Sequence, residues 1–295
     1  MRDARGARDG QPLKILKLPE IHGVRTYHLH KLAIMPDISL AMVVALCAAA
    51  LAAGWIDAVV GGGGLLMMPV LLLGLPDTSS AAQYALGTNK AMAIVGTTGA
   101  AVTYTRKTRV DVRLAVRIGV AAVAGSTAGA FVAAGMSTDT LKPVIMVVLL
   151  GVGAFVIFRP AFGTAPATTP VSARRVLAAI GLAGLGIGFY DGLIGPGTGT
   201  FLVLALTALL HLDLVTASAT AKIVNCCTNA GALAIFAWQG TVYWQLGALL
   251  AGFNLVGGTV GAHTALKKGS GFVRVVLLVV VFTLVANLAY QQWVA

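Results

Sequence analysis

The chain consists of long apolar segments separated by short polar or glycine-rich interruptions. The apolar segments lie at residues 38–60, 64–76, 83–105, 114–135, 143–158, 176–194, 199–210, 216–237, 246–266 and 272–290. Several approach or exceed the roughly 20 residues that an α-helix needs to cross a bilayer core. They do not alternate apolar and polar residues, as the strands of a transmembrane barrel do. The pattern predicts an all-α, polytopic membrane protein.

Two apolar stretches are interrupted in the same way. In 54-GWIDAVVGGGGLLMMPVLLL-73 and 186-GIGFYDGLIGPGTGTFLVL-204, an apolar helix reaches an aspartate, breaks over glycines and resumes as an apolar helix. We expect the resumed half-helices to begin near Leu65 and Thr200. Backbone without helical partners is tolerated at membrane depth only where it is buried in protein or lines a polar cavity. The breaks therefore predict a cavity; tight packing by small residues is the alternative.

The sequence also contains an internal repeat. An offset of 132 residues, read from the sequence, pairs Lys90 with Lys222, and an offset of 134 pairs Asp57 with Asp191. Because these rare intramembrane charges pair as well as the common small residues, we interpret the chain as a duplication. The predicted organisation is a basic tail, a first transmembrane repeat, a cytoplasmic linker and a second transmembrane repeat, at residues 1–37, 38–158, 159–175 and 176–295.

Loop charges predict that the repeats are inverted. Residues 106–117 carry five cations, and cytoplasmic loops are enriched in Lys and Arg. The corresponding stretch, 238-WQGTVYWQLGAL-249, carries none and has the Trp and Tyr of a membrane interface. If each glycine break is a hairpin that returns to its own side, each half adds three transmembrane helices. Alternatively, residues 38–60 cross fully and the halves differ there. Inverted repeats are typical of secondary transporters.

Composition supports a membrane protein. Hydrophobic residues make up 58% of the chain, charged residues 11%, and the mean hydropathy is +0.88. The net charge of +11 comes from the tail and the loops, so we interpret it as topogenic and expect no nucleic-acid partner. We expect the tail to be disordered, with Met35 as an alternative start. Cys47, Cys226 and Cys227 fit small packing residues.

The candidate binding residues are those of the two breaks and the polar residues of the neighbouring helices. A helix N-terminus offers free N–H donors and partial positive charge, which favour an anion. The break residues expected at the site are Gly61, Gly62, Gly63, Gly64, Gly195, Gly197, Thr198, Gly199 and Thr200. The helix residues are Asn89, Lys90, Lys222, Asn225 and Asn229, of which the last three share one helix face.

The two lysines have two interpretations. Each lies about seven residues inside its segment, roughly 10 Å along a helix, where an unpaired charge is costly. In one interpretation, each lysine pairs with the aspartate of its own half, Lys90 with Asp57 and Lys222 with Asp191. In the other, the lysines line the cavity and counter an anion. The aspartates are also candidate proton carriers, whereas His263 is either a packing residue or a relay.

Enzymatic motifs are missing from the sequence. No Walker, Rossmann, metal-spaced Cys/His or Ser-His-Asp arrangement occurs, and 61-GGGG-64 lacks the Gly-Lys-Ser/Thr of a phosphate loop. We therefore expect no enzyme, no cofactor and no metal.

The segments 54–75, 84-YALGTNKAMAIVGTTGA-100, 188–206 and 217-ASATAKIVNCCTNAGALAIFAWQGTV-242 resemble the TauE/SafE sulfite exporter family, also called the four-toluene-sulfonate uptake family. The resemblance extends over nearly all of residues 38–292, and is strongest to its probable membrane transporter branch. It implies a multi-pass inner-membrane permease for sulfur-containing anions such as sulfite or sulfonates. Family motifs fall on Gly61 to Gly64, Asn89, Lys90, Gly195, Gly197, Thr198, Gly199, Lys222, Asn225 and Asn229. The adjacent cysteines and the basic tail depart from the family pattern.

The resulting hypothesis is an anion permease that works by alternating access and is a candidate for proton coupling. Its expected partners are a small anionic substrate and the lipid bilayer, and a homodimer is one open oligomeric state. A passive anion channel and a non-transporting membrane scaffold are the alternatives. The sequence leaves open the identity of the anion, the direction of transport and the coupling ion.

Overall fold

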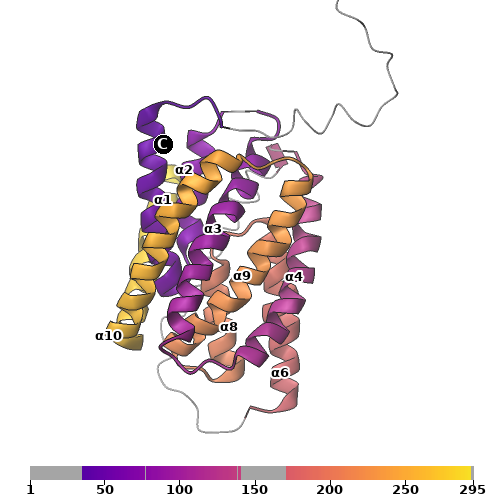
Figure 1. Cartoon of the computed structure of the whole chain (residues 1–295), viewed down its shortest axis with the longest axis vertical. Helices are drawn as coiled ribbons and strands as arrows, with labels where there is room; N and C mark the ends of the chain where they lie inside the picture. Colours follow the sequence, from indigo (N-terminus) through magenta and orange to yellow (C-terminus); the bar gives the residue numbers. More distant parts are fainter. Residues whose placement is uncertain (1–34, 77, 138, 141–170, 294–295) are drawn as a thin grey trace, which may run out of the picture. The chain divides into compact units, whose positions relative to one another are not determined.

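The computed structural model describes residues 35–76, 78–137, 139–140 and 171–293, within a compact unit that comprises residues 32–295 (Figure 1). The expected basic tail, apart from its last three residues, the apolar segment 143–158 and most of the linker lie outside the described residues. Every regular element in the described ranges is helical. The all-α prediction is therefore confirmed.

The first half supplies four described helices: α1 (Leu40–Val60), α2 (Gly63–Gly74), α3 (Ala81–Thr105) and α4 (Val112–Ala134). Ser39 caps α1 by accepting from Met42 N at 3.2 Å, and Asp111 caps α4 by accepting from Leu114 N at 2.9 Å. Such caps satisfy N–H groups that have no partner within the helix. At its other end, α1 stops at Gly61, whose φ of 79° lies in the left-handed region.

The second half begins with three short helical pieces that continue one another: α6 (Ala173–Ala179), the π-helix η1 (Ile180–Gly186) and α7 (Ile187–Leu193). The predicted linker, 159–175, thus ends inside a helix. Three elements follow: α8 (Thr198–Leu210), α9 (Leu214–Trp238) and α10 (Trp244–Trp293). The last is interrupted at Gly269, where φ is 76° and ψ is −174°. A π-helical turn sits just before Asp191, whereas the matching part of α1 is regular.

Four helical stretches in the described ranges are long and apolar enough to cross a membrane: Leu40–Val60, Val112–Ala134, Ala173–Leu193 and Trp244–Val273. The pair α8 and α9, bent by 120°, passes the same criterion together. With 12 residues, α2 is shorter than a span. By length, the helix that precedes each glycine break could therefore cross fully, as in the alternative for residues 38–60.

The fourth helix of each half packs on the other half. The most extensive contacts of α10 are with α1 and α3, and those of α4 are with α9 and with the α7–η1 stretch. Helices far apart in sequence consequently lie side by side in the bundle (Figure 1). The two predicted repeats fall within one compact unit.

Glycine contacts repeat between the halves residue by residue. A Cβ on Gly125 of α4 would lie 2.4 Å from Leu185 O, and a Cβ on Gly257 of α10 would lie 2.0 Å from Leu51 O. The next turn repeats the pattern: Gly129 meets Phe189 O at 2.0 Å, and Gly261 meets Trp55 O at 2.5 Å. In each case the partners correspond under the offsets of 132 and 134 residues. Small residues permit such close backbone approach in membrane bundles. The correspondence read from the sequence therefore recurs in these packing contacts.

The direction of the helices is consistent with inversion. In Figure 1, α1 begins at the upper end of the bundle and α6 at the lower end. The side of the membrane that each end faces stays a prediction.

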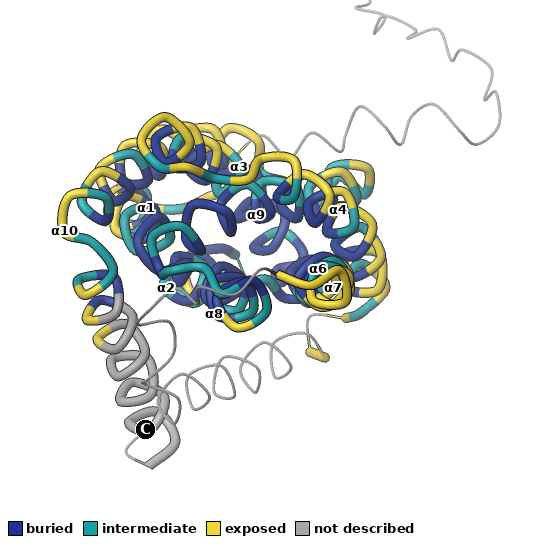
Figure 2. Tube along the Cα trace, turned by 90° about the horizontal axis from the view of Figure 1, so that it is seen from below, coloured by how far each residue is buried: buried dark blue, intermediate teal, exposed yellow. Residues whose placement is uncertain are grey.

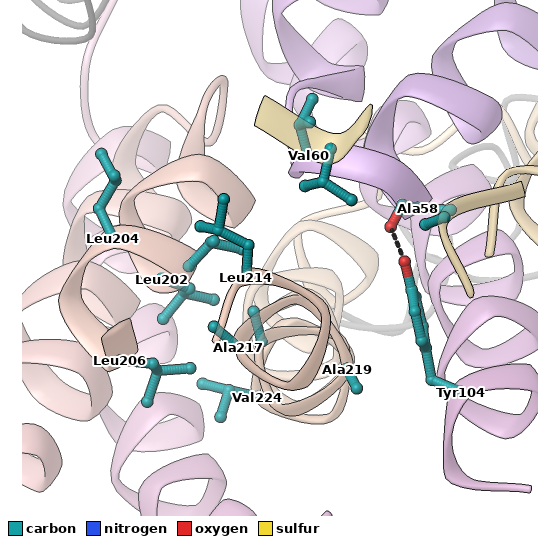
Figure 3. Packing of buried hydrophobic residues seen from close by; sticks show 14 of the residues in the cluster. Ala58, Val60, Tyr104, Leu202, Leu204, Leu206, Leu214, Ala217, Ala219 and Val224 are labelled. Atoms are coloured by element: carbon teal, nitrogen blue, oxygen red, sulfur yellow. Dashed lines mark hydrogen bonds between the residues drawn. The ribbon is translucent and has the colours of Figure 1, made fainter. Parts of the chain in front are cut away.

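Burial is concentrated on the inward sides of the helices, and exposed positions lie on their outer sides (Figure 2). Many exposed side chains are large and apolar, for example Leu73 at 83%, Val120 at 66% and Phe131 at 60%. One buried cluster joins the end of α1 to α8 and α9 and includes the buried ring of Tyr104 (Figure 3). An apolar outer surface of this kind suits a lipid environment.

Candidate functional site

The two glycine breaks touch each other. A Cβ on Gly61 would lie 2.0 Å from the carbonyl carbon of Gly199, and a Cβ on Gly64 would lie 3.2 Å from the Cα of Pro196. The half-helices α2 and α8 start at Gly63 and Thr198, each two residues before its expected start. Positive φ at Gly61, Gly195 and Gly197 turns the chain between the helix pieces. The breaks therefore form one joint feature at the contact between the halves.

The carbonyl groups at the end of α1 are satisfied largely by the second half. Tyr104 OH donates to Ala58 O at 2.9 Å, and Ser218 Oγ donates to Val59 O at 3.3 Å (Figure 3 shows the tyrosine bond). Thr200 donates twice, from Oγ1 to Val60 O at 2.9 Å and from N to Gly61 O at 3.2 Å. Because buried carbonyl groups without partners are costly, these bonds fix the first break against α8 and α9.

The break of the second half is fixed by its own residues. Thr198 donates to Gly195 O from Oγ1 at 2.6 Å and from N at 3.2 Å. Tyr190 OH donates to Pro196 O. The two breaks are therefore alike in position but differ in how their backbone groups are satisfied.

The lysines form ion pairs across the halves. Lys90 Nζ lies 2.6 Å from Asp191 Oδ2, and both side chains are almost fully buried. Lys222 Nζ lies 2.8 Å from Asp57 Oδ2, and Thr97 Oγ1 donates to the same oxygen at 3.4 Å. The interpretation in which each lysine pairs with the aspartate of its own half is wrong, because each lysine contacts the aspartate of the other half. We call these contacts the crossed ion pairs.

A cavity of ≈ 30 Å³ opens between the breaks and the crossed ion pairs. This is about a tenth of the smallest sites for drug-sized ligands, which measure roughly 300–1,000 Å³. It suits a few water molecules or one small ion. Its lining includes most of the predicted site residues: Asp57, Gly61, Gly63, Gly64, Asn89, Lys90, Asp191, Gly195, Thr198, Gly199, Asn225 and Asn229.

Four predicted site residues lie outside the lining, and each has a supporting position. Gly62 and Gly197 precede the first residues of α2 and α8 as N-caps. Thr200 is bonded to the end of α1. Lys222, whose side chain is fully buried, reaches the cavity only through Asp57.

Sequence reasoning missed part of the lining, namely Ala53, Met92, Ala93 and Asn254. Asn254 lies on α10 and donates from Nδ2 to Ala50 O at 2.9 Å. The sequence feature that could have identified Asn254 is its position inside an apolar segment, because a polar side chain is rare and costly within a membrane. Its repeat counterpart, Ala122, is apolar, so the duplication gave no second indication.

The cavity lining contains both donors and acceptors. Gly63, Gly64 and Gly199 stand at helix starts, and the hydrogen bonds of the described residues provide no acceptor for their N–H groups. Asn225 and Asn229 are joined by a hydrogen bond, in which Asn229 Nδ2 donates to the backbone carbonyl oxygen of Asn225 at 2.9 Å. By contrast, Asn89 Oδ1 is buried and has no hydrogen-bond partner.

The described residues contain no group of three His, Cys, Asp or Glu side chains that could hold a metal ion. His263 is exposed on α10, and its Nδ1 lies 2.8 Å from Thr259 O, outside the cavity lining. The titratable lining groups are thus Asp57, Lys90 and Asp191.

Comparison with known proteins gives consistent matches. The family profile described as "Sulfite exporter TauE/SafE" matches residues 46–288. A "Probable membrane transporter protein ORF9" of Sinorhizobium sp is 31% identical over 258 residues, covering 86% of this chain and 95% of that protein. A "Probable membrane transporter protein" of Haemophilus influenzae is 31% identical, with 87% and 98% covered. "Probable membrane transporter protein YfcA" of Escherichia coli is 30% identical, with 82% and 88% covered. No solved structure matches significantly.

Proposed function

Because this chain belongs to the TauE/SafE sulfite exporter family of membrane transporters, we propose that it carries small sulfur-containing anions, such as sulfite or organosulfonates, across the cell inner membrane. The mechanism proposed is alternating access with coupled proton movement. A small-molecule substrate and a lipid environment follow from membership; the chemical class and the coupling are the proposal.

The observation that carries the proposal is the cavity where the starts of α2 and α8 meet a buried lysine. Two helix N-termini aimed at one small space add partial positive charges, and free N–H groups of glycine allow close approach of an oxyanion. Secondary transporters use broken helices near the bilayer midplane in this way. The small volume favours a compact oxyanion.

Roles follow from position. Gly63, Gly64 and Gly199 supply N–H donors, and Lys90 supplies the cation nearest the bound anion. Lys222 acts through Asp57, which it holds in place. Asp57 is the proposed proton carrier, because its side chain is 18% exposed whereas that of Asp191 is 3% exposed.

Alternating access requires a movement that the crossed ion pairs would resist. Each pair joins a break of one half to a long helix of the other. An anion that binds Lys90 competes with Asp191 for the same charge, so binding weakens one of the contacts that join the halves. The glycine breaks are the proposed hinges, because positive-φ glycines tolerate a change of backbone angles best.

The test is thermal stability of the detergent-purified protein with sulfite, sulfate, thiosulfate, sulfoacetate, taurine and chloride, followed by uptake into proteoliposomes. A ligand that binds only the folded state raises its stability with concentration. We expect a selective rise with one sulfur oxyanion. In K90M/D191N, which removes one crossed ion pair and leaves the cavity without that cation, the rise should disappear. K107A, at an exposed loop lysine, is the matched control and should keep it.

The outcomes separate this proposal from its alternatives. Saturable uptake that responds to a proton gradient supports a coupled carrier, whereas non-saturating flux independent of the gradient indicates a passive channel. If no anion stabilises the protein or enters the vesicles, the anion permease is refuted and a scaffold becomes the better interpretation.

A further inference from the structure

Asn89 places an unsatisfied acceptor at the candidate anion site. The residue is 6% exposed, lines the cavity and precedes Lys90 on α3. Its Oδ1 has no hydrogen-bond partner. A buried polar atom without a partner costs about 1–3 kcal/mol. Because Asn89 lines the cavity, an occupant that donates a hydrogen bond to this residue would satisfy the atom.

A second acceptor lies at the same cavity. Asp57 lines it, and its Oδ2 is engaged by Lys222 at 2.8 Å and by Thr97 at 3.4 Å. The side chain stays 18% exposed although it lies in an ion pair. An occupant that has only hydrogen-bond acceptors could not donate to Asp57 or to Asn89 Oδ1, so both of these acceptors would stay without a hydrogen from the ligand.

The charges of the site disfavour a doubly charged occupant. The four charged side chains around the cavity are Asp57, Lys90, Asp191 and Lys222, and the crossed ion pairs neutralise them two by two. A monoanion adds one uncompensated charge to this buried site, and a dianion adds two. Because burying uncompensated charge is costly, the site should discriminate against dianions.

We propose that the cavity binds a monoanion that carries its own O–H or N–H donor, such as hydrogen sulfite, and that Asn89 Oδ1 accepts this hydrogen bond. The anionic oxygens then face the N–H groups of Gly63, Gly64 and Gly199, and the protonated side faces Asn89 and Asp57. This inference rests on the proposed function and specifies the protonation state of its substrate.

The test compares sulfamate with methanesulfonate at one neutral pH. Both are monoanions of similar size, but sulfamate has N–H donors where methanesulfonate has a methyl group. One hydrogen bond to a buried acceptor corresponds to about a tenfold difference in affinity. We expect the wild-type protein to bind sulfamate about tenfold more tightly, measured by calorimetry or ligand-dependent thermal stability. Sulfate, a dianion at this pH, should bind more weakly than either.

Asn89→Leu removes the acceptor and replaces the amide with an apolar side chain of similar size. We expect the preference for sulfamate over methanesulfonate to disappear. Thr207→Val is the matched control, because Thr207 Oγ1 is also buried without a partner but lies outside the cavity lining. This control should keep the sulfamate preference.

Equal affinity of the wild-type protein for the two monoanions would overturn the inference and leave the proposed function standing. Tighter binding of sulfate, or a sulfamate preference that survives in Asn89→Leu, would also overturn it. If sulfite and all three probes fail to bind, the proposed function fails together with this inference. The wild-type comparison does not depend on whether any variant folds.

Discussion

At the scale of single residues, the structure depends on a few buried polar groups whose partners come from distant parts of the chain. Lys90 and Asp191 are 101 residues apart in sequence, and Lys222 and Asp57 are 165 residues apart. Inside an apolar bundle, each charge is stable only beside its partner, because removing one partner leaves a buried charge uncompensated. The crossed ion pairs therefore specify which helices lie next to each other.

This arrangement predicts which second substitution rescues the loss of a lysine. K90M leaves Asp191 buried and unpaired and should lower the free energy of unfolding by about 3–5 kcal/mol. Adding D191N should recover much of that loss, since the uncompensated charge disappears. Adding D57N instead should lower stability further, because Lys222 then loses its partner. Apparent melting temperatures in detergent measure this; rescue by D57N and not by D191N would support pairing within each half.

At the scale of elements, the two glycine breaks interrupt their helices and also pack against each other. Gly61 ends α1 with a positive φ, and its Cα faces Gly199 at the start of α8. The terminal carbonyl groups of α1 are bonded to Tyr104, Ser218 and Thr200. The end of one broken helix thus depends on the start of the other.

A side chain at this contact should not be tolerated. In Gly61→Ala, the new Cβ would lie 2.0 Å from the carbonyl carbon of Gly199 and the backbone would be strained, so we expect a loss of about 3 kcal/mol or more. Gly252→Ala is the control, because no atom lies within 4 Å of its Cβ position in α10. It should be neutral or stabilise by about 0.5–1 kcal/mol. Similar melting temperatures for the two variants would contradict the close contact.

At the scale of the whole transmembrane unit, α4 and α10 each pack mainly against helices of the other half, and this packing joins the two halves into one bundle. Corresponding glycine contacts occur where α4 packs on the second half and where α10 packs on the first half. A movement of one half must therefore carry the fourth helix of the other half with it, or slide along these small-residue contacts.

Inverted repeats would place two corresponding segments, the one that follows α3 and the one that follows α9, on opposite sides of the membrane. In a variant with Cys47, Cys226 and Cys227 replaced by alanine, single cysteines at the exposed positions 109 and 245 should react with membrane-impermeant reagents from opposite sides. Residue 109 should label from the cytoplasmic side only. Labelling of both positions from the same side would exclude inverted repeats.

The sequence by itself determined the all-helical class, the positions of both breaks to within two residues and most of the cavity lining. These features are local: apolar length sets the helices, glycine sets the breaks, and polar residues such as Asn89 and Lys90 inside apolar segments are costly enough to be conspicuous. The internal repeat then identified which local features correspond.

Only the tertiary structure decided which partners meet. It paired each lysine with the aspartate of the other half, placed Lys222 behind Asp57 and brought Asn254 to the cavity. Each result depends on which helices become neighbours. The preference of α4 and α10 for the opposite half arises from the summed packing of many small contacts, which no single stretch of sequence contains.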